Sequence, residues 1–339
     1  MKFGILLRSQ FLPHEDAAQC FADVCAMARH ADALGFDNLV KGSHYGGADL
    51  LDFQQMPLLA RLAVEAPNCR LTTGIVLLSL HKPLDIAEQI ATLDVISSGR
   101  VNFGCGLGYR DVEFEAFGTN QAERVARLEE NLDVIKRLWT QASVTHTGSH
   151  FTLRDVSPSI RPVQRPRPPI WMGANADGAI RRAARLADCW YLPPHNRGDT
   201  LTRQMDVYKA ELEKLDKPLP SELPIRREVF VAPTRAEAMR HWSGAIERKY
   251  QSYNQWGQGK PMPEGDNDLG QALDELMQDR FLVGEPDAVT ESIVNLCAPL
   301  GITQLVISVH NPGMDVQAAL DSMQLFAEQV MPAVNQAML

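Results

Sequence analysis

The chain contains one glycine-rich stretch whose spacing is close to that of a nucleotide-binding turn. It reads RVNFGCGLGYR over residues 100–110, an apolar run followed by Gly104, Gly106 and Gly108. A dinucleotide site needs GxGxxG on the turn between a strand and its helix, where backbone N–H groups bind the pyrophosphate. Here the spacing is GxGxG, and no clean helix is predicted before Gln121. The stretch therefore indicates either a tight strand-to-loop turn or a strand end that a flat ring approaches closely.

A second glycine turn, GANADG at residues 173–178, leads from a short apolar run into a helical stretch that contains Arg181 and Arg182. The N-terminus of a helix presents backbone N–H groups that have no partner within the helix, so it is a ready anion site. The turn is therefore either a phosphate site or an ordinary strand-to-helix turn that binds nothing. Asp177, within the turn, either caps the helix or lies close to the anion and opposes it.

The composition limits the class of protein. The 339 residues include 33 Lys and Arg against 42 Asp and Glu, a formal net charge of −9, which argues against a nucleic-acid partner or an anionic membrane surface. No apolar run approaches the roughly 20 residues that span a bilayer, and the N-terminus lacks the long apolar region of a secretory signal. The six cysteines form no CxxC pair and no cluster with histidine. Reduced thiols, no metal site and a cytoplasmic location are therefore expected.

The candidate residues are embedded in a regular alternation of strand-like and helical segments. Apolar residues at helical spacing predict the helices, and short apolar runs rich in Ile, Val and Thr predict the strands. Strand followed by helix, repeated eight times, predicts parallel strands joined by right-handed crossovers. The predicted strands are residues 2–8, 36–42, 69–80, 100–108, 169–174, 189–192, 225–232 and 303–309.

Eight such units suit a closed (β/α)8 TIM barrel, in which the site lies at the carboxyl ends of the strands. An open doubly wound sheet is the competing interpretation. No linker divides the chain, so residues 1–339 are expected to form a single barrel domain. Two predicted insertions interrupt the pattern. Residues 144–168 contain a hairpin that turns at Gly148 and then a proline-rich segment, and residues 254–282 mix Gly, Pro and polar residues in a way that suits a mobile lid.

Four segments in this order resemble the bacterial luciferase-like flavin-dependent monooxygenases. They begin GFDNLVKGSHY at residue 35, LTTGIVLLSLHKPLDIAEQ at residue 71, RPPIWMGANADG at residue 167 and LVGEPDAVTESI at residue 282. The resemblance covers nearly the whole chain and fades between about residues 195 and 280. It implies a (β/α)8 barrel, in agreement with the strand count.

The resemblance also implies roles for particular residues. His44, in GSHY after the second strand, matches a histidine that lies over the flavin and is the candidate catalytic residue; the alternative is a surface histidine in a loop. The pair Gly74–Ile75 matches a cis peptide bond without proline beside the flavin ring. The implied cofactor-binding residues are Gly74, Ile75, Gly106, Tyr109, Gly173, Ala174, Asn175 and Ala176.

The chain departs from bacterial luciferase at two positions. Leu107 stands where luciferase has an arginine that holds the flavin phosphate, and Gly106 stands where it has a reactive cysteine. Light emission is therefore not expected. The candidate substitutes for the missing charge are Arg110, Arg181 and Arg182, and the residues expected around the mouth of the pocket are Tyr109, Trp171, Trp190, His81 and His310.

The function implied by the resemblance is oxygenation of a small organic substrate by O2 and reduced FMN, with no metal. Because the barrel carries no second domain for NAD(P)H, a separate flavin reductase is the implied partner. A homodimer is also implied. The alternatives are an oxidoreductase that uses the deazaflavin F420 on the same barrel and a flavin-binding protein without turnover.

Overall fold

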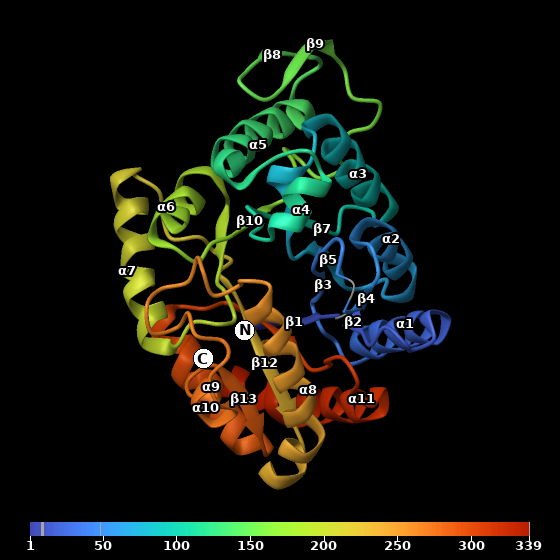
Figure 1. The fold of residues 1–339 in the computed structure, drawn as a ribbon, viewed down its shortest axis with the longest axis vertical. Helices are drawn as coiled ribbons and strands as arrows, with labels where there is room; N and C mark the ends of the chain where they lie inside the picture. Colours follow the sequence, from blue (N-terminus) through green and yellow to red (C-terminus); the bar gives the residue numbers. More distant parts are fainter. Residues whose placement is uncertain (8–9, 48, 339) are drawn as a thin grey trace.

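The fold is built around eight parallel strands that curl into a barrel (Figure 1). The structure is a computed structural model that describes residues 1–7, 10–47 and 49–338. Each strand pairs in parallel with its neighbours, as predicted for a (β/α)8 barrel. The strands of the barrel are β1 (Lys2–Leu6), β3 (Asn38–Lys41), β5 (Arg70–Thr73), β7 (Val101–Gly106), β10 (Ile170–Gly173), β11 (Cys189–Tyr191), β12 (Pro224–Val231) and β14 (Gln304–Ser308).

The barrel closes between β11 and β12 through one isolated parallel bridge, Leu192 to Ile225. Further along β12, from Glu228 onward, the same edge pairs with β13 (Phe281–Gly284). The strand β13 is therefore the neighbour of the carboxyl-terminal half of β12, where β11 no longer pairs with it. The sequence pattern did not reveal β13, because four apolar residues between a turn and a helix have no distinctive periodicity.

Helices cover the outside of the barrel (Figure 1), and the barrel strands between them are almost entirely buried. A strand buried on both faces reads as a continuous apolar run, which is the pattern that predicted most of the strands. The larger helices are α1 (Ala17–Ala33), α2 (Gln55–Glu65), α3 (Pro83–Ile96), α5 (Arg124–Thr140), α6 (Asp177–Leu186), α7 (Gly198–Lys214), α8 (Arg235–Gln255), α10 (Pro286–Leu300), α11 (Val316–Leu325) and α12 (Met331–Ala337).

The two segments that the sequence pattern marks as insertions contain little regular structure. Residues 144–168 contain the expected hairpin, β8 (Val144–Thr147) with β9 (Thr152–Val156), which lies beyond α5 in Figure 1. Residues 254–282 contain turns, the short helix α9 (Leu273–Met277) and the start of β13. Two short ribbon strands, β2 (Gln10–Phe11) and β4 (Leu51–Asp52), were not predicted, because two-residue strands leave no periodic signal.

The segment after the fourth barrel strand corrects one prediction. Residues 111–116 form a short helix, α4 (Asp111–Ala116), where no clean helix was expected. Acidic Asp111 and Glu113 lie in its first turn, which the helix dipole favours. Phe114 is buried and packs in a small cluster with Leu77 and Leu80. Tertiary packing thus stabilises a helix that is too short to show helical periodicity.

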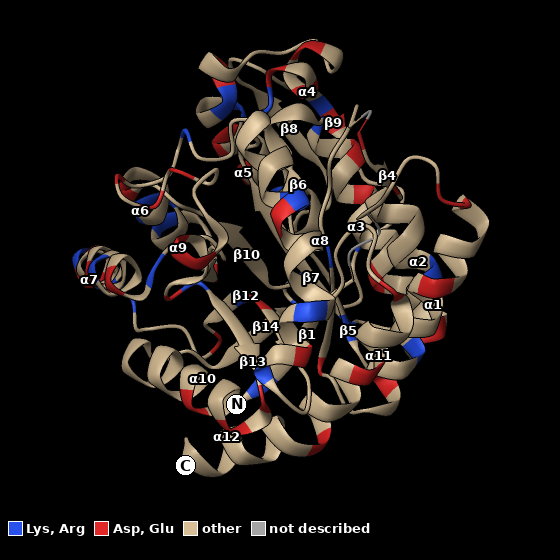
Figure 2. Cartoon of the chain, turned by 60° about the horizontal axis from the view of Figure 1, so that its bottom comes forward, with Lys and Arg blue, Asp and Glu red and all other residues tan. Residues whose placement is uncertain are grey.

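Charged side chains of both signs are mixed over the outer helices (Figure 2). Within the described residues, no helix has the length and apolar composition needed to cross a membrane.

Candidate active site

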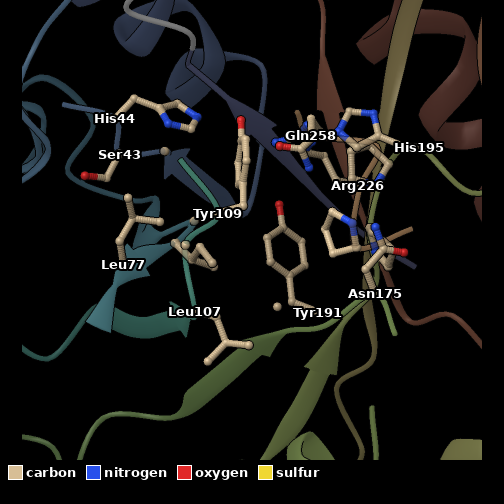
Figure 3. Close-up of a pocket in the computed structure, with 18 of the residues that line it drawn as sticks. Ser43, His44, Leu77, Leu107, Tyr109, Asn175, Tyr191, His195, Arg226 and Gln258 are labelled. Atoms are coloured by element: carbon tan, nitrogen blue, oxygen red, sulfur yellow. The ribbon is translucent and has the colours of Figure 1, made fainter. Parts of the chain in front are cut away.

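A cavity of about 400 Å³ opens at the carboxyl ends of the barrel strands, a size typical of small-molecule sites. Figure 3 shows Tyr109 and Tyr191 near its centre, with His44 and Ser43 on one side and Arg226, His195 and Gln258 on the other. Eight of the nine predicted site residues line it, namely His44, Gly74, Ile75, Tyr109, Gly173, Ala174, Asn175 and Ala176.

Gly106, the ninth predicted residue, does not line the cavity. It lies at the buried end of β7, and a Cβ added there would stand 2.1 Å from Cδ1 of Ile75. The missing side chain of Gly106 therefore makes room for Ile75, which does line the cavity. The peptide bond between Gly74 and Ile75 is cis, as the resemblance implied.

His44 is held by a buried carboxylate. Its Nδ1 lies 3.1 Å from Oε1 of Glu113, whose side chain is fully buried. The same carboxylate oxygen accepts hydrogen bonds from the backbone N–H of Tyr45 at 3.0 Å and from Nη1 of Arg110 at 3.3 Å. Because an ionised carboxylate only accepts hydrogen bonds, His44 donates through Nδ1, and its Nε2 is left as the proton-accepting atom. Glu113 was not predicted, since it lies on the unpredicted helix α4.

Arg110 connects this dyad to a segment that covers the cavity. Its guanidinium lies 4.2 Å from the ring centroid of Trp256, and the ring of His44 lies 5.4 Å from the same tryptophan. Trp256 directly follows α8 and begins the cover segment, residues 256–262, of which Gly257, Gln258, Lys260 and Pro261 line the cavity. Part of residues 254–282 therefore lines the cavity, and an Arg–aromatic contact joins it to the group that orients His44.

The turn at the end of β10 is fixed from behind by three side chains. The indole N–H of Trp190 donates to the carbonyl of Ala174 at 3.0 Å. Gln204 donates to the carbonyl of Asn175 at 2.5 Å, and Asn196 donates to the side-chain oxygen of Asn175 at 2.8 Å. These bonds fix the turn at the N-terminus of α6, where the capping residue Ala176 and Ala179 of the first turn line the cavity.

An arginine that was not predicted adds a positive charge to the lining of the cavity. Arg124, at the start of α5, lines the cavity together with Gln121, to which its guanidinium donates a hydrogen bond. The three predicted substitutes lie elsewhere: Arg110 is bonded to Glu113, Arg182 pairs with Glu129 at 2.7 Å, and Arg181 is exposed on the surface. These three arginines lie close to the glycine turns in sequence. Arg124 instead comes near the start of α6 because α5 and α6 lie side by side, linked by Arg182 with Glu129 and by Lys136 with the carbonyl of Leu186.

Asp177 is neutralised where it lies. It occupies the first position of α6, with Ala176 as the capping residue, and it binds both terminal nitrogens of Arg203 at 2.9 Å. The hydrogen bond from Arg203 lowers the pKa of Asp177. The partnership with Arg203 therefore resolves the conflict that the sequence suggested between this carboxylate and an anion at the helix.

Two tyrosines, Tyr109 and Tyr191, stand in the middle of the cavity (Figure 3). Burial raises the pKa of Tyr109 well above its usual value, so its hydroxyl stays protonated at neutral pH. That buried oxygen has no hydrogen-bond partner among the described residues. Tyr109 is therefore a donor available to a bound molecule.

Four residues expected around the mouth do not line the cavity. Trp171 and Trp190 are fully buried in the barrel wall. His81 contacts Tyr45, with 3.3 Å between Nε2 and the hydroxyl, and His310 packs against Phe11 with 5.4 Å between ring centroids. Side chains alternate in direction along a strand, so proximity to a strand end does not itself place a side chain in the cavity.

The chain belongs to the luciferase-like monooxygenase family, whose family model matches residues 1–304. It is 22% identical to the oxygenase component of a flavin-dependent trigonelline monooxygenase from Acinetobacter baylyi, over 99% of this chain and 96% of that protein. It is 24% identical to an FMNH(2)-dependent dimethylsulfone monooxygenase from Pseudomonas fluorescens, over 91% of this chain and 86% of that protein. Among solved structures, the monooxygenase RslO1 from Streptomyces bottropensis superimposes with a TM-score of 0.86 at 27% identity, over 98% and 99% of the two chains.

Proposed function

We propose that this chain is the oxygenase component of a two-component system that uses reduced FMN and O2 to oxygenate a small organic substrate. The observation that carries the proposal is the pairing of an anion-binding end, Arg124 beside the N-terminus of α6, with a His44–Glu113 dyad elsewhere on the wall of one cavity. The FMN-dependent and flavin-dependent relatives support the choice of cofactor.

The lining of the cavity supports the choice of a flavin. Ile75, Leu77 and Leu107 give it apolar wall on which a flat ring can lie. Arg124 and the first turn of α6 would hold the phosphate, because a guanidinium and the helix N-terminus both favour an anion. Leu107 replaces an arginine of luciferase, and Arg124 supplies a positive charge on the same side of the barrel.

When bound, reduced FMN supplies the electrons that activate O2, and the protein supplies position, dryness and proton transfer. Nε2 of His44 would accept or return a proton, while Glu113 keeps Nδ1 protonated and the ring oriented. The hydroxyl of Tyr109 would donate a hydrogen bond to a reacting oxygen. The cover segment would keep water out of the cavity, which matters because water diverts activated oxygen into hydrogen peroxide.

The test is an anaerobic titration of the protein with reduced FMN, oxidised FMN and F420. We expect one reduced FMN per chain, bound more tightly than the oxidised form, because the reduced flavin arrives from a separate reductase. Arg124→Gln is expected to weaken binding about 10-fold or more, and Arg181→Gln, an exposed arginine on α6, is the matched control. Preferential binding of F420, or no binding of either FMN form, would refute the cofactor assignment.

Turnover separates an enzyme from a protein that only binds flavin. A reductase and NAD(P)H supply reduced FMN, and candidate substrates are screened for product. An oxygenase incorporates one atom of labelled O2 into the product. The chain would instead be a flavin-binding protein without turnover if it binds flavin but forms no product from any candidate and its peroxide release does not change with substrate.

We also propose that the chain acts as a homodimer. Val64 on α2 and Ile96 on α3 are 75% and 49% exposed, and Val95 beside Ile96 is 42% exposed. The helices α2 and α3 are in contact with each other. Sedimentation equilibrium measures the oligomeric state of the parent chain and of Val64→Lys. We expect a dimer for the parent and a monomer for the variant, and a monomeric parent would refute the homodimer.

A further inference from the structure

The cavity carries an excess of positive charge that a flavin phosphate does not use up. Its charged lining residues are four cations, Lys41, Arg124, Arg226 and Lys260, and one carboxylate, Asp52. This excess is notable because the whole chain has a formal net charge of −9. Cations gathered in a cleft of a protein with acidic overall charge attract anionic ligands.

Two of the four cations have an evident partner. Lys41, buried at the end of β3, places Nζ 3.1 Å from Oδ1 of Asp52 and 2.7 Å from the carbonyl of Gly42. Arg124 lies at the anion-binding end, where the proposed function assigns it to the flavin phosphate. The positive charges of Arg226 and Lys260 have no such partner assigned to them.

Arg226 has little compensation from the protein. Its side chain is 15% exposed, and its nearest carboxylate is Glu228, 3.9 Å from Nη2. That distance is too long for a hydrogen bond, and Glu228 already pairs with Nζ of the buried Lys249 at 2.5 Å. Nε of Arg226 is buried and has no partner among the described residues. This guanidinium is largely buried and has no carboxylate within hydrogen-bond distance, which is costly unless a ligand supplies the anion.

The neighbouring groups of Arg226 do not supply that anion. Tyr109 lies between Arg226 and His44 in Figure 3, and its raised pKa keeps it neutral. His195 and Gln258, which Figure 3 draws on the same side of the cavity as Arg226, carry no negative charge in any ordinary protonation state. Lys260, on the cover segment, adds a second positive charge to the cavity lining.

Arg226 is also separated from the phosphate end. Arg124 follows β7, whereas Arg226 lies on β12, three strands further around the barrel through β10 and β11. The two arginines therefore enter the cavity from different sides of the barrel. The planar guanidinium matches a carboxylate in geometry, since two parallel N–H groups meet two oxygens.

We propose that the substrate is a small organic acid whose carboxylate binds Arg226, with Lys260 contributing from the cover segment. This inference rests on the proposed function, since it assigns the substrate of that oxygenase. The carboxylate is held on the β12 side of the cavity, and the remainder of the acid extends past Tyr109 toward His44. Oxygenation is therefore directed to a part of the molecule remote from the carboxylate.

The experiment compares acids with their uncharged amides by calorimetry. Benzoate, cyclohexanecarboxylate and hexanoate are each paired with the primary amide of the same skeleton. Binding is measured to the protein loaded with reduced FMN under nitrogen and to the flavin-free protein. We expect at least one acid to bind about 10- to 100-fold more tightly than its amide.

The variants assign that preference to a residue. Arg226→Gln is expected to abolish the preference for acid over amide, Arg226→Lys to retain part of it, and Lys260→Gln to reduce it a few-fold. Arg240→Gln is the matched control, because Arg240 is 68% exposed on α8. Melting temperatures accompany each titration, and the conservative Arg226→Lys variant keeps the test decisive if Arg226→Gln does not fold.

Two results would overturn the inference: no acid binds more tightly than its amide in the parent protein, or the preference survives in Arg226→Gln. Loss of reduced-FMN affinity in Arg226→Gln with the acid preference unchanged would likewise assign Arg226 to the flavin. Failure of the parent to bind reduced FMN, with an acid preference intact in the flavin-free protein, would instead refute the proposed cofactor.

Discussion

Oε1 of Glu113 lies 3.1 Å from Nδ1 of His44, although 69 positions separate the two residues in the sequence. His44 follows β3 and Glu113 lies after β7, two strands away across β5. The barrel brings them together because the segments after parallel strands meet at the same end of the sheet. Glu113 is a positioning residue, and it acts through the imidazole that it orients.

Glu113→Gln is expected to raise hydrogen peroxide release at the expense of product. A neutral amide accepts a weaker hydrogen bond from Nδ1 of His44 and can also donate one, so it no longer fixes the tautomer of the ring. Flavin affinity is expected to change little. The measurement is peroxide formed per O2 consumed, with Glu115→Gln, an exposed glutamate of the same helix, as the control. A lower melting temperature with unchanged coupling would show that Glu113 is only structural.

His44→Ala is expected to retain the fold and the affinity for reduced FMN and to slow product formation about 10²- to 10⁴-fold, the usual effect of losing a general acid–base group. Hydrogen peroxide replaces product. Stopped-flow product formation, flavin titration and thermal melting on the same variant check this. A variant that oxygenates substrate as efficiently as the parent would exclude a catalytic role for His44.

Trp256→Ala removes the ring that lies 4.2 Å from the Arg110 guanidinium, an interaction typically worth about 0.5–2 kcal/mol. The cover segment is expected to open more often, so reduced FMN dissociates faster and peroxide release increases. Dissociation is followed by displacement with excess flavin. Trp256→Phe keeps an aromatic face and is expected to behave close to the parent; equal losses in both variants would contradict this explanation.

Gly106→Ala is expected to destabilise the protein by about 1–3 kcal/mol, a typical result of overpacking, because the new methyl group would stand 2.1 Å from Cδ1 of Ile75. Ile75→Val removes that Cδ1 atom, so the double variant is expected to recover much of the loss. Denaturant unfolding measures each free energy. Gly178→Ala, where a Cβ meets nothing within 4 Å, is the control. Strictly additive effects would contradict the proposed contact.

His81 is expected to make the folded state sensitive to mild acid. Burial lowers the pKa of His81 from its usual 6.5, so below that pH the unfolded state binds more protons than the folded state. Stability is therefore highest above pH 6.5 and falls as the pH drops toward the folded pKa. His81→Gln is expected to flatten this part of the pH profile of unfolding free energy, and exposed His14→Gln to leave it unchanged. An identical slope in both variants would refute the assignment.

The barrel could be predicted from the sequence because its strands are buried on both faces and its helices are long and amphipathic. The strands around Ile5 and Ile307 contain continuous apolar runs, whereas β13 and α4 are too short for periodicity to register. Local pattern is therefore informative wherever an element buries a long surface, and tertiary contacts decide the rest.

The candidate site was only partly predictable for a related reason. His44 and the turn from Gly173 to Ala176 stand beside recognisable strand ends, and they do line the cavity. Glu113, Arg124 and Arg226 gain their meaning only from three-dimensional neighbours, such as a histidine 69 positions away. Nothing in their sequence context separates them from Arg110 or Arg181, because charged residues on loops and helices look alike until the fold sets their distances.

The single bridge between Leu192 and Ile225 makes the β-barrel unequal around its circumference. Every other junction in the ring is held by at least two successive residue pairs, whereas this one is held by two backbone bonds, from Leu192 to the carbonyl of Pro224 and from Arg226 to the carbonyl of Leu192. Spontaneous local opening should begin at this junction, so the amide protons of Leu192 and Arg226 should exchange with deuterium before those of β1 or β14. The barrel would then open transiently between β11 and β12, beside the guanidinium of Arg226, while the strands on the opposite side stay paired.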